Sequence, residues 1–172
     1  VGTRMTVIRL GNGELIVISP IDVDEITIQQ INELGNVTTI IAPNCYHYLF
    51  LASFQSIYPK AKIWTAPGLD AKIPTLTIDR ILNDRGTIGN LDEIEYFLFA
   101  GFQTIGIGGS GILNEIVFWH RESQSVILTD TAFHFDTSFP WQTRLVARIV
   151  GGDRALEPTI LEKIACRDKE QV

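Results

Sequence analysis

Residues 37–47 read VTTIIAPNCYH, a β-branched run that passes abruptly into a polar turn. The segment from Val37 to Ala42 is typical of a strand buried on both faces of a parallel sheet. Pro43 and Asn44 then turn the chain, and we expect a helix to begin there, with the Asn44 side chain capping its first turn. Open α/β sheets bind ligands at the carboxyl ends of their strands, so the residues after Ala42 are candidates for a functional site.

The chain before this segment predicts a hairpin and then a helix. Residues 6–10 and 15–18 are β-branched runs on either side of an Asn-Gly pair, which is a strong hairpin signal. Asp22, with a glutamate three residues later, gives a capping-box-like start to a helix that Gly35 ends. Between them, Ile28, Ile31 and Leu34 recur at helical spacing.

The chain after this segment continues the alternation and then becomes richer in strands. Residues 49–58 repeat apolar side chains at helical spacing, and residues 61–66 predict a third strand. Residues 72–90 carry loop signals. Later strands are expected at residues 94–99, 104–107, 115–120 and 125–129, and helical spacing returns at 141–150 and 159–166. The apolar residues expected to pack the second helix are Leu49, Phe50, Phe54, Ile57 and Tyr58. Together these patterns predict an α/β protein.

Composition limits the functions that the chain can have. With 172 residues, 45% of them hydrophobic and a net charge of −6, it reads as a single globular domain over residues 1–172. Its acidity and the absence of basic runs argue against a nucleic-acid partner. No run approaches the length of a membrane span. We expect a cytoplasmic protein, or one in an organelle lumen after removal of a leader, and a natural chain that continues beyond Val172.

Three segments together resemble a metallo-β-lactamase-like family, that of the domain of unknown function 4336 (DUF4336). They are Ala42-Pro43-Asn44 with His47 and residues 49–51; residues 58–64 with 66–69; and residues 115–121 with 128–130. The resemblance spans roughly Met5 to Val150. It implies an αββα sandwich, in which two mixed sheets pack face to face with helices on the outer faces. We expect this sandwich to be truncated at its C-terminus.

The resemblance also implies where metal ligands would stand. Active relatives carry His-x-His-x-Asp-His after the strand, and these positions fall on Ala42, Asn44, Tyr46 and His47. Only His47 is a good ligand, whereas Asn44 and Tyr46 are residues of the inherited cleft. A later ligand histidine falls near Gly111, which has no side chain. The sequence holds three histidines, too few for a tight dinuclear centre.

The remaining ligand candidates lie near the end of the last expected strand. Asp130 corresponds to the bridging aspartate of active relatives, and His134 follows four residues later. With His47 they form a candidate site for one weakly bound zinc or iron ion. Each residue also has a structural interpretation: Asp130 could cap the loop after it, and His134 could lie at the surface. His120 is interpreted as the exposed end of a hairpin strand.

Two other motifs were weighed. Residues 106–111 match the dinucleotide-binding pattern G-x-G-x-x-G, but the residues that follow are β-branched and aromatic and favour a strand. We therefore expect a glycine-rich connection between strands and no bound nucleotide cofactor. Cys45 is expected at the start of a helix, where the helix dipole would lower the pKa of its thiol and could make it reactive. The alternative interpretation is a small buried residue.

The sequence thus predicts a fold more firmly than a reaction. The leading hypothesis is a protein with a degenerate metal site that is non-hydrolytic or weakly metal-binding and uses the inherited cleft for a small ligand or a protein partner. The alternative is a metal-dependent ester or thioester hydrolase with a rearranged site at His47, Asp130 and His134. No catalytic residue is assigned. Whether the chain forms a homo-oligomer stays open.

Overall fold

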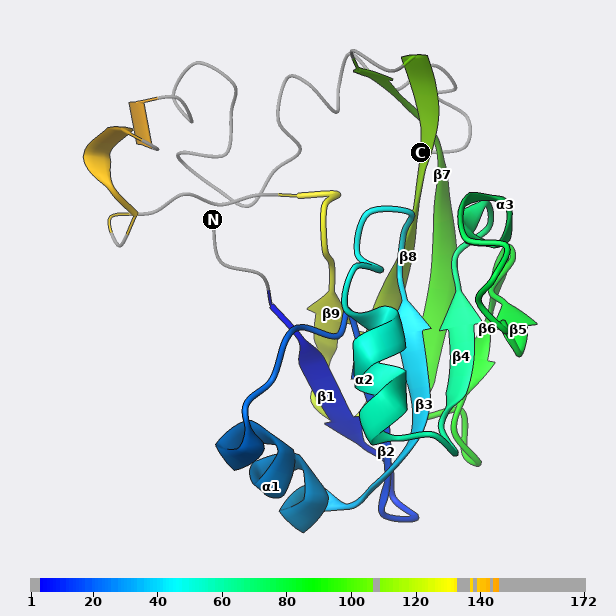
Figure 1. Cartoon of the computed structure of the whole chain (residues 1–172), viewed down its shortest axis with the longest axis vertical. Coiled ribbons are helices and arrows are strands. Elements are labelled where there is room, and N and C mark those ends of the chain that lie inside the picture. The colour runs from blue at the N-terminus through cyan, green and yellow to red at the C-terminus, as the bar shows by residue number, and fades with distance from the viewer. Residues whose placement is uncertain (1–3, 107–108, 133–136, 138, 143, 146–172) are drawn as a thin grey trace. The chain divides into compact units, whose positions relative to one another are not determined.

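The computed structural model describes residues 4–106, 109–132, 137, 139–142 and 144–145. Contacts divide the chain into two compact units. The first comprises residues 1–98 and 116–127, and the second comprises residues 99–115 and 128–172. Most of the described secondary structure belongs to the first unit, shown with the rest of the chain in Figure 1.

Sheet A of the first unit is mixed, with its strands in sequence order (Figure 1). The strands are β1 (Thr6–Arg9), β2 (Glu14–Ile18), β3 (Asn36–Ala42), β4 (Lys62–Thr65) and β5 (Arg80–Ile81). β1 and β2 form the predicted antiparallel hairpin, whereas β2, β3, β4 and β5 run parallel to one another. The central position of β3, with parallel neighbours on both sides, confirms the interpretation of residues 37–42 as a fully buried strand.

The first helix, α1 (Glu25–Leu34), forms where expected but begins two residues later than predicted. Its cap is Asp24, whose Oδ1 accepts a hydrogen bond of 2.8 Å from the backbone N–H of Thr27. A side-chain hydrogen bond with Thr27, together with this backbone one, lowers the pKa of Asp24. The prediction of Asp22 as the cap was therefore wrong. Gly35 ends the helix as expected. Only glycine fits at this position, because a Cβ there would collide with the carbonyl oxygen of Gly13.

The second helix, α2 (Leu51–Ile57), corrects a prediction about the turn after β3. The helix does not begin at Asn44, because residues 44–50 form a bridge and successive turns before the first helical residue. Leu51 and Phe54 bury the helix against the sheet, but Leu49, predicted to be apolar packing, is 73% exposed. A third, short helix, α3 (Leu69–Lys72), follows β4; it was not predicted, and it ends where the expected loop region of residues 72–90 begins.

Sheet A separates two hydrophobic cores, and β3 supplies both. On the helix side, Ile40 packs with residues of α1, α2 and α3, including Ile31, Phe54 and Leu69. On the other side, Ile41 packs with residues of a second sheet. Fully burying each such side chain stabilises the fold by about 1.5–3 kcal/mol. The first unit is thus layered as helices, sheet A and a second sheet.

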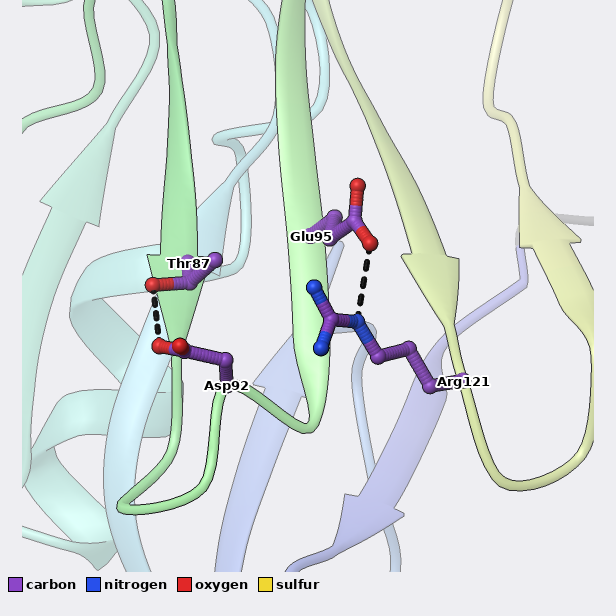
Figure 2. A network of polar contacts seen from close by, with 4 residues as sticks. All are labelled: Thr87, Asp92, Glu95 and Arg121. Carbon is purple, nitrogen blue, oxygen red and sulfur yellow. Dashed lines mark hydrogen bonds and ion pairs between the residues drawn. The ribbon is translucent and has the colours of Figure 1, made fainter.

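The second sheet, sheet B, has the order β6-β7-β8-β9. Its strands are β6 (Arg85–Ile88), β7 (Ile94–Gly106), β8 (Gly109–His120) and β9 (Ser125–Ile127). Two of the expected strands, at residues 94–99 and 104–107, are one continuous strand, and β5 and β6 were not predicted. Two polar contacts join strands of this sheet to loops (Figure 2): Thr87 of β6 donates to Asp92 in the loop before β7 at 2.5 Å, and Arg121, which follows β8, pairs with Glu95 of β7 at 2.8 Å.

The helices expected at residues 141–150 and 159–166 lie mostly or wholly outside the described residues. At the start of the former, the N–H of Arg144 donates to the carbonyl of Pro140 at 3.1 Å. In the part of the chain that the structure describes, no helix has the length and apolar character needed to span a membrane.

Candidate functional site

The carboxyl ends of β2, β3 and β4 meet at one edge of sheet A, which we call the carboxyl edge. Backbone hydrogen bonds extend the ladder just past the strands, from Ser19 N to Ile41 O at 2.9 Å and from Ala66 N to Ala42 O at 3.0 Å. Ser19, directly after β2, therefore lies beside the end of β3, and Asn44 stands in the turn two residues beyond Ala42. This is the edge at which ligands bind in open α/β sheets.

Asn44 organises the turn after β3. Its side chain is completely buried, and its Oδ1 accepts hydrogen bonds of 2.8 Å from the backbone N–H groups of both Tyr46 and His47. The predicted capping role is thus present, but it closes a local turn instead of starting a helix. The Oδ1 atom, which is the side-chain atom able to bind a metal, instead accepts hydrogen bonds from the backbone.

His47 is held by a residue that sequence reasoning missed. Its Nδ1 lies 2.6 Å from the Oγ of Ser19, which is only 3% exposed. Ser19 has a φ of 57°, in the left-handed region that non-glycine residues seldom occupy, and such strain clusters at functional sites. The only sequence signal for Ser19 was that it directly follows a buried strand and precedes a proline.

Tyr46 and Lys72 line the outer part of the same turn. Tyr46 is 44% exposed, and the Lys72 Nζ lies 4.9 Å from the centre of its ring and 4.7 Å from that of Tyr48. The same ammonium donates to the carbonyl oxygen of Cys45 at 2.6 Å. Lys72 therefore places a cation at this turn, where cation–π contacts and a charge-assisted hydrogen bond hold it.

Cys45 is not set up as an activated thiol. Since α2 begins six residues later, Cys45 does not stand at its N-terminus, and the expectation that it did was wrong. Burial raises the pKa of the Cys45 thiol, an effect that the Lys72 charge only partly offsets. A raised pKa disfavours the reactive thiolate, so Cys45 fits the alternative interpretation of a small, half-buried residue.

Thr65 adds a buried hydroxyl at the end of β4. It is fully buried and pairs in register with Ala42 of β3. Within the described residues its Oγ1 has no hydrogen-bond partner. A buried hydroxyl normally has a hydrogen-bond partner. Thr65 is therefore an exception, a polar side chain at the otherwise apolar end of β4.

Asp130 belongs to the second unit, where a buried glutamate fixes its backbone. Glu115 is 2% exposed, and its two carboxylate oxygens accept hydrogen bonds of 2.7 Å from the N–H groups of Thr129 and Asp130. Burial raises the pKa of Glu115, while these hydrogen bonds and one from Thr131 act in the opposite direction. Glu115 was seen in the sequence only as the start of a strand.

The other histidines complete the account of the predicted residues. His134 lies outside the described residues. His120 ends β8 as predicted, and its Nδ1 lies 2.7 Å from Ser123 Oγ in the turn before β9. The glycine-rich residues 106–111 are followed by β8, a strand, as the sequence predicted, and not by the helix that a dinucleotide site requires.

The two sheets and the helices define a metallo-β-lactamase fold. The crystal structure of DIM-1 metallo-β-lactamase exposed to ceftazidime has a TM-score of 0.54 and 11% identity, covering 92% of this chain and 87% of that chain. A second crystal structure of DIM-1 metallo-β-lactamase has a TM-score of 0.48 and 13% identity, covering 70% of this chain, which spans 55% of the length of that one.

The chain belongs to the family described as "Domain of unknown function (DUF4336)", whose model matches residues 1–154. The resemblance found in the sequence is thereby confirmed, as is the fold class that it implied. A comparison with curated proteins found no match.

The metal centre implied by the fold was tested against the donor atoms present. Among the described residues, no three histidine, cysteine, aspartate or glutamate side chains come together as a metal-binding group. At the carboxyl edge, Asn44 Oδ1 accepts two backbone hydrogen bonds and His47 Nδ1 contacts Ser19. These described residues do not fit a dinuclear centre, which needs several imidazoles and carboxylates converging on each ion.

Proposed function

We propose that this protein binds a small ligand at the carboxyl edge of sheet A and does not hydrolyse it through a dinuclear metal centre. The observation that carries the proposal is the use made of the turn after β3. Asn44 directs its oxygen to the N–H groups of Tyr46 and His47, and His47 directs Nδ1 to Ser19. In this proposal any metal is a single, weakly bound zinc or iron ion.

The side chains around this turn support a binding role. His47 supplies an imidazole, the exposed Tyr46 supplies a phenol, and Lys72 supplies a cation over the Tyr46 ring. Aromatic and polar groups of this kind orient small ligands, whereas the buried strands behind them form a rigid support. A small molecule is therefore the occupant that we favour over a protein partner.

One observation favours the alternative, a metal-dependent ester or thioester hydrolase. The carboxylate of Glu115 clamps the backbone at Thr129 and Asp130 with two hydrogen bonds of 2.7 Å. Fixing a ligand by a buried neighbour is common around metal ions. In this alternative His47 and Asp130 bind the ion, with His134 as a further ligand.

A metal titration separates the two proposals. Zinc and iron(II) are titrated into the purified full chain by calorimetry, and the metal content is measured by elemental analysis. The binding proposal predicts no site tighter than about 1 µM, which corresponds to about 8 kcal/mol. Two tightly bound ions per chain would refute it.

Matched variants make the titration specific. The hydrolase alternative predicts that His47→Ala removes both bound metal and esterase or thioesterase activity. His120→Ala is the control, because His120 is also a histidine whose Nδ1 contacts a serine, but it lies at the end of a hairpin strand. If neither variant changes the metal content, the hydrolase alternative is excluded.

A further inference from the structure

We infer that the outer face of sheet B, the face that points away from sheet A, carries a second binding site, for a small planar aromatic carboxylate. The site is a groove of about 300 Å³ whose lining comes from all four strands of the sheet. It lies on a different sheet from the carboxyl edge, so the inference goes beyond the proposed function. The side chains that line it are Arg85, Glu95, Phe97, Val117, Trp119 and Val126.

The alternation of side chains along the strands explains why these residues share one face. The alternate residues of β7 and β8, Phe118 among them, are buried in the core that faces sheet A. Their neighbours in each strand therefore point to the opposite face. The register then brings side chains of adjacent strands together, because Arg85 lies opposite Phe97 and Trp119 lies opposite Val126.

The floor of the groove is apolar and open to solvent. Phe97 and Val126 are 49% and 56% exposed, whereas Val117 and Trp119 on the strand between them are partly buried. Within the described residues α1, α2 and α3 pack on sheet A, so none of these helices covers this face. Apolar side chains that are exposed together in this way are typical of binding sites. The rings of Phe97 and Trp119 favour a flat aromatic ligand.

Arg85 supplies a positive charge that has no partner. It is exposed, and within the described part of the chain its side chain forms no ion pair and no hydrogen bond. The acidic group of the groove is already neutralised, because Glu95 pairs with Arg121 at 2.8 Å (Figure 2). A guanidinium binds a carboxylate through two parallel hydrogen bonds. Charge complementarity therefore selects a carboxylate as the polar group of the ligand.

The volume of the groove limits the size of the ligand. Ligand pockets usually span about 300–1,000 Å³, so a groove of about 300 Å³ is suited to a small molecule. The probe that we choose is 1-naphthoate, a flat bicyclic carboxylate of about 13 non-hydrogen atoms. At ordinary ligand efficiency a molecule of this size binds with a Kd of about 1 mM or tighter.

Trp119 reports directly on the groove. In the full chain labelled with ¹⁵N at tryptophan, Trp119→Phe assigns one of the three indole N–H signals. We expect 1-naphthoate to shift the Trp119 signal, and to bind about fivefold more tightly than 1-naphthamide, which has the same rings without the charge. No shift of Trp119 at about 5 mM 1-naphthoate would overturn the inference. Equal affinity for the two probes would overturn the assignment of a carboxylate.

Two arginine variants test the source of the charge. Arg85→Gln should abolish the preference for 1-naphthoate and leave the affinity for 1-naphthamide unchanged. Arg9→Gln is the matched control, because Arg9 is also an exposed strand arginine without an ion pair among the described residues, but it stands in β1 of sheet A. A preference that survives Arg85→Gln, or that is lost equally in Arg9→Gln, would overturn the role of Arg85.

A change in the floor tests the apolar contact. Val126→Ser should weaken the binding of both probes by about threefold or more, because part of the apolar surface that the ligand covers is removed. Val126 is exposed on a strand at the edge of the sheet, so the variant should fold, and unchanged Trp64 and Trp141 signals would show that it does. Unchanged affinity for both probes in this folded variant would overturn the apolar floor.

Two other occupants of the groove are outcomes that overturn the inference. A dimer in analytical ultracentrifugation that Val126→Ser dissociates would show that a second copy covers the groove. A Trp119 signal that a soluble nitroxide does not broaden in the free protein would show that another part of the chain covers it. Two tightly bound metal ions would refute the proposed function and leave this groove untouched, so the two proposals fail in different experiments.

Discussion

Replacing Glu115 with glutamine tests whether its buried carboxylate clamps the loop at Asp130. Each carboxylate oxygen accepts one backbone N–H at 2.7 Å, from Thr129 and from Asp130. Glutamine offers only one oxygen and turns an NH₂ group toward the second N–H. Leaving that buried donor unpaired costs about 1–3 kcal/mol. Because the substitution also removes a charge that burial disfavours, we expect a net loss of about 2 kcal/mol near neutral pH.

The stability lost in Glu115→Gln should depend on pH. Burial raises the pKa of Glu115 above its ordinary value of 4.5, so the folded protein binds this proton more tightly than the unfolded chain does. The contribution of Glu115 to stability is therefore fully present below pH 4.5 and is lost as the pH rises through the raised pKa. Glu115→Gln has no such titration, so the stability difference from wild type should narrow as the pH increases across that window.

The assay is urea unfolding followed by circular dichroism at a series of pH values above 4.5. Glu95→Gln is the control, because Glu95 is a half-exposed carboxylate paired with Arg121 (Figure 2) and should contribute less than about 1 kcal/mol. Hydrogen exchange at the N–H groups of Thr129 and Asp130 should accelerate only in Glu115→Gln. If both variants are equally stable at every pH, the clamp does not exist.

Three further substitutions test the turns and close contacts. Asn44→Ala should cost about 1–3 kcal/mol, because two part-buried N–H groups lose their acceptor, and Asn44→Ser should recover part of this in the same urea assay. Gly35→Ala should destabilise by more than Gly13→Ala: a Cβ at Gly35 collides with a backbone carbonyl, whereas Gly13 has a φ of 85° but open space around it. Equal losses of stability in these two variants would contradict the predicted collision at Gly35. Gly86→Ala places a Cβ 2.7–2.8 Å from the Tyr96 ring and should cost about 1–3 kcal/mol, read as a lowered melting temperature. An unchanged melting temperature would show that the ring moves freely.

Sequence patterns located the strands that carry a local signal, and they missed the strands that form only because they pair with a neighbouring strand. The β-branched run of β3 and the Asn-Gly hairpin before it are local signals, and both were correct. By contrast, β5 has two residues and exists because Arg80 pairs with Trp64. The continuous β7 appeared as two strands because an Ala-Gly pair at residues 100–101 interrupts its pattern.

In the candidate site, likewise, the residues of a local motif could be predicted, whereas their tertiary partners could not. His47 and Asn44 stand in a motif, so they could be found, although the start of α2 could not, because the Asn44 side chain satisfies a local turn instead of a helix. Ser19 and Glu115 act on residues far along the chain, 28 positions away for the contact with His47. Nothing in the sequence around a lone serine or glutamate encodes such a tertiary partner, and only the fold reveals it.

The division of the interior by sheet A has a consequence for how substitutions combine. Ile40 and Ile41 are neighbours in the chain, but one packs with the helices and the other with sheet B. A change of side-chain volume on one side is therefore compensated by residues on that side, and the opposite core can keep its own packing. Substitutions in the core beneath the helices can therefore be tolerated without disturbing the packing between the two sheets.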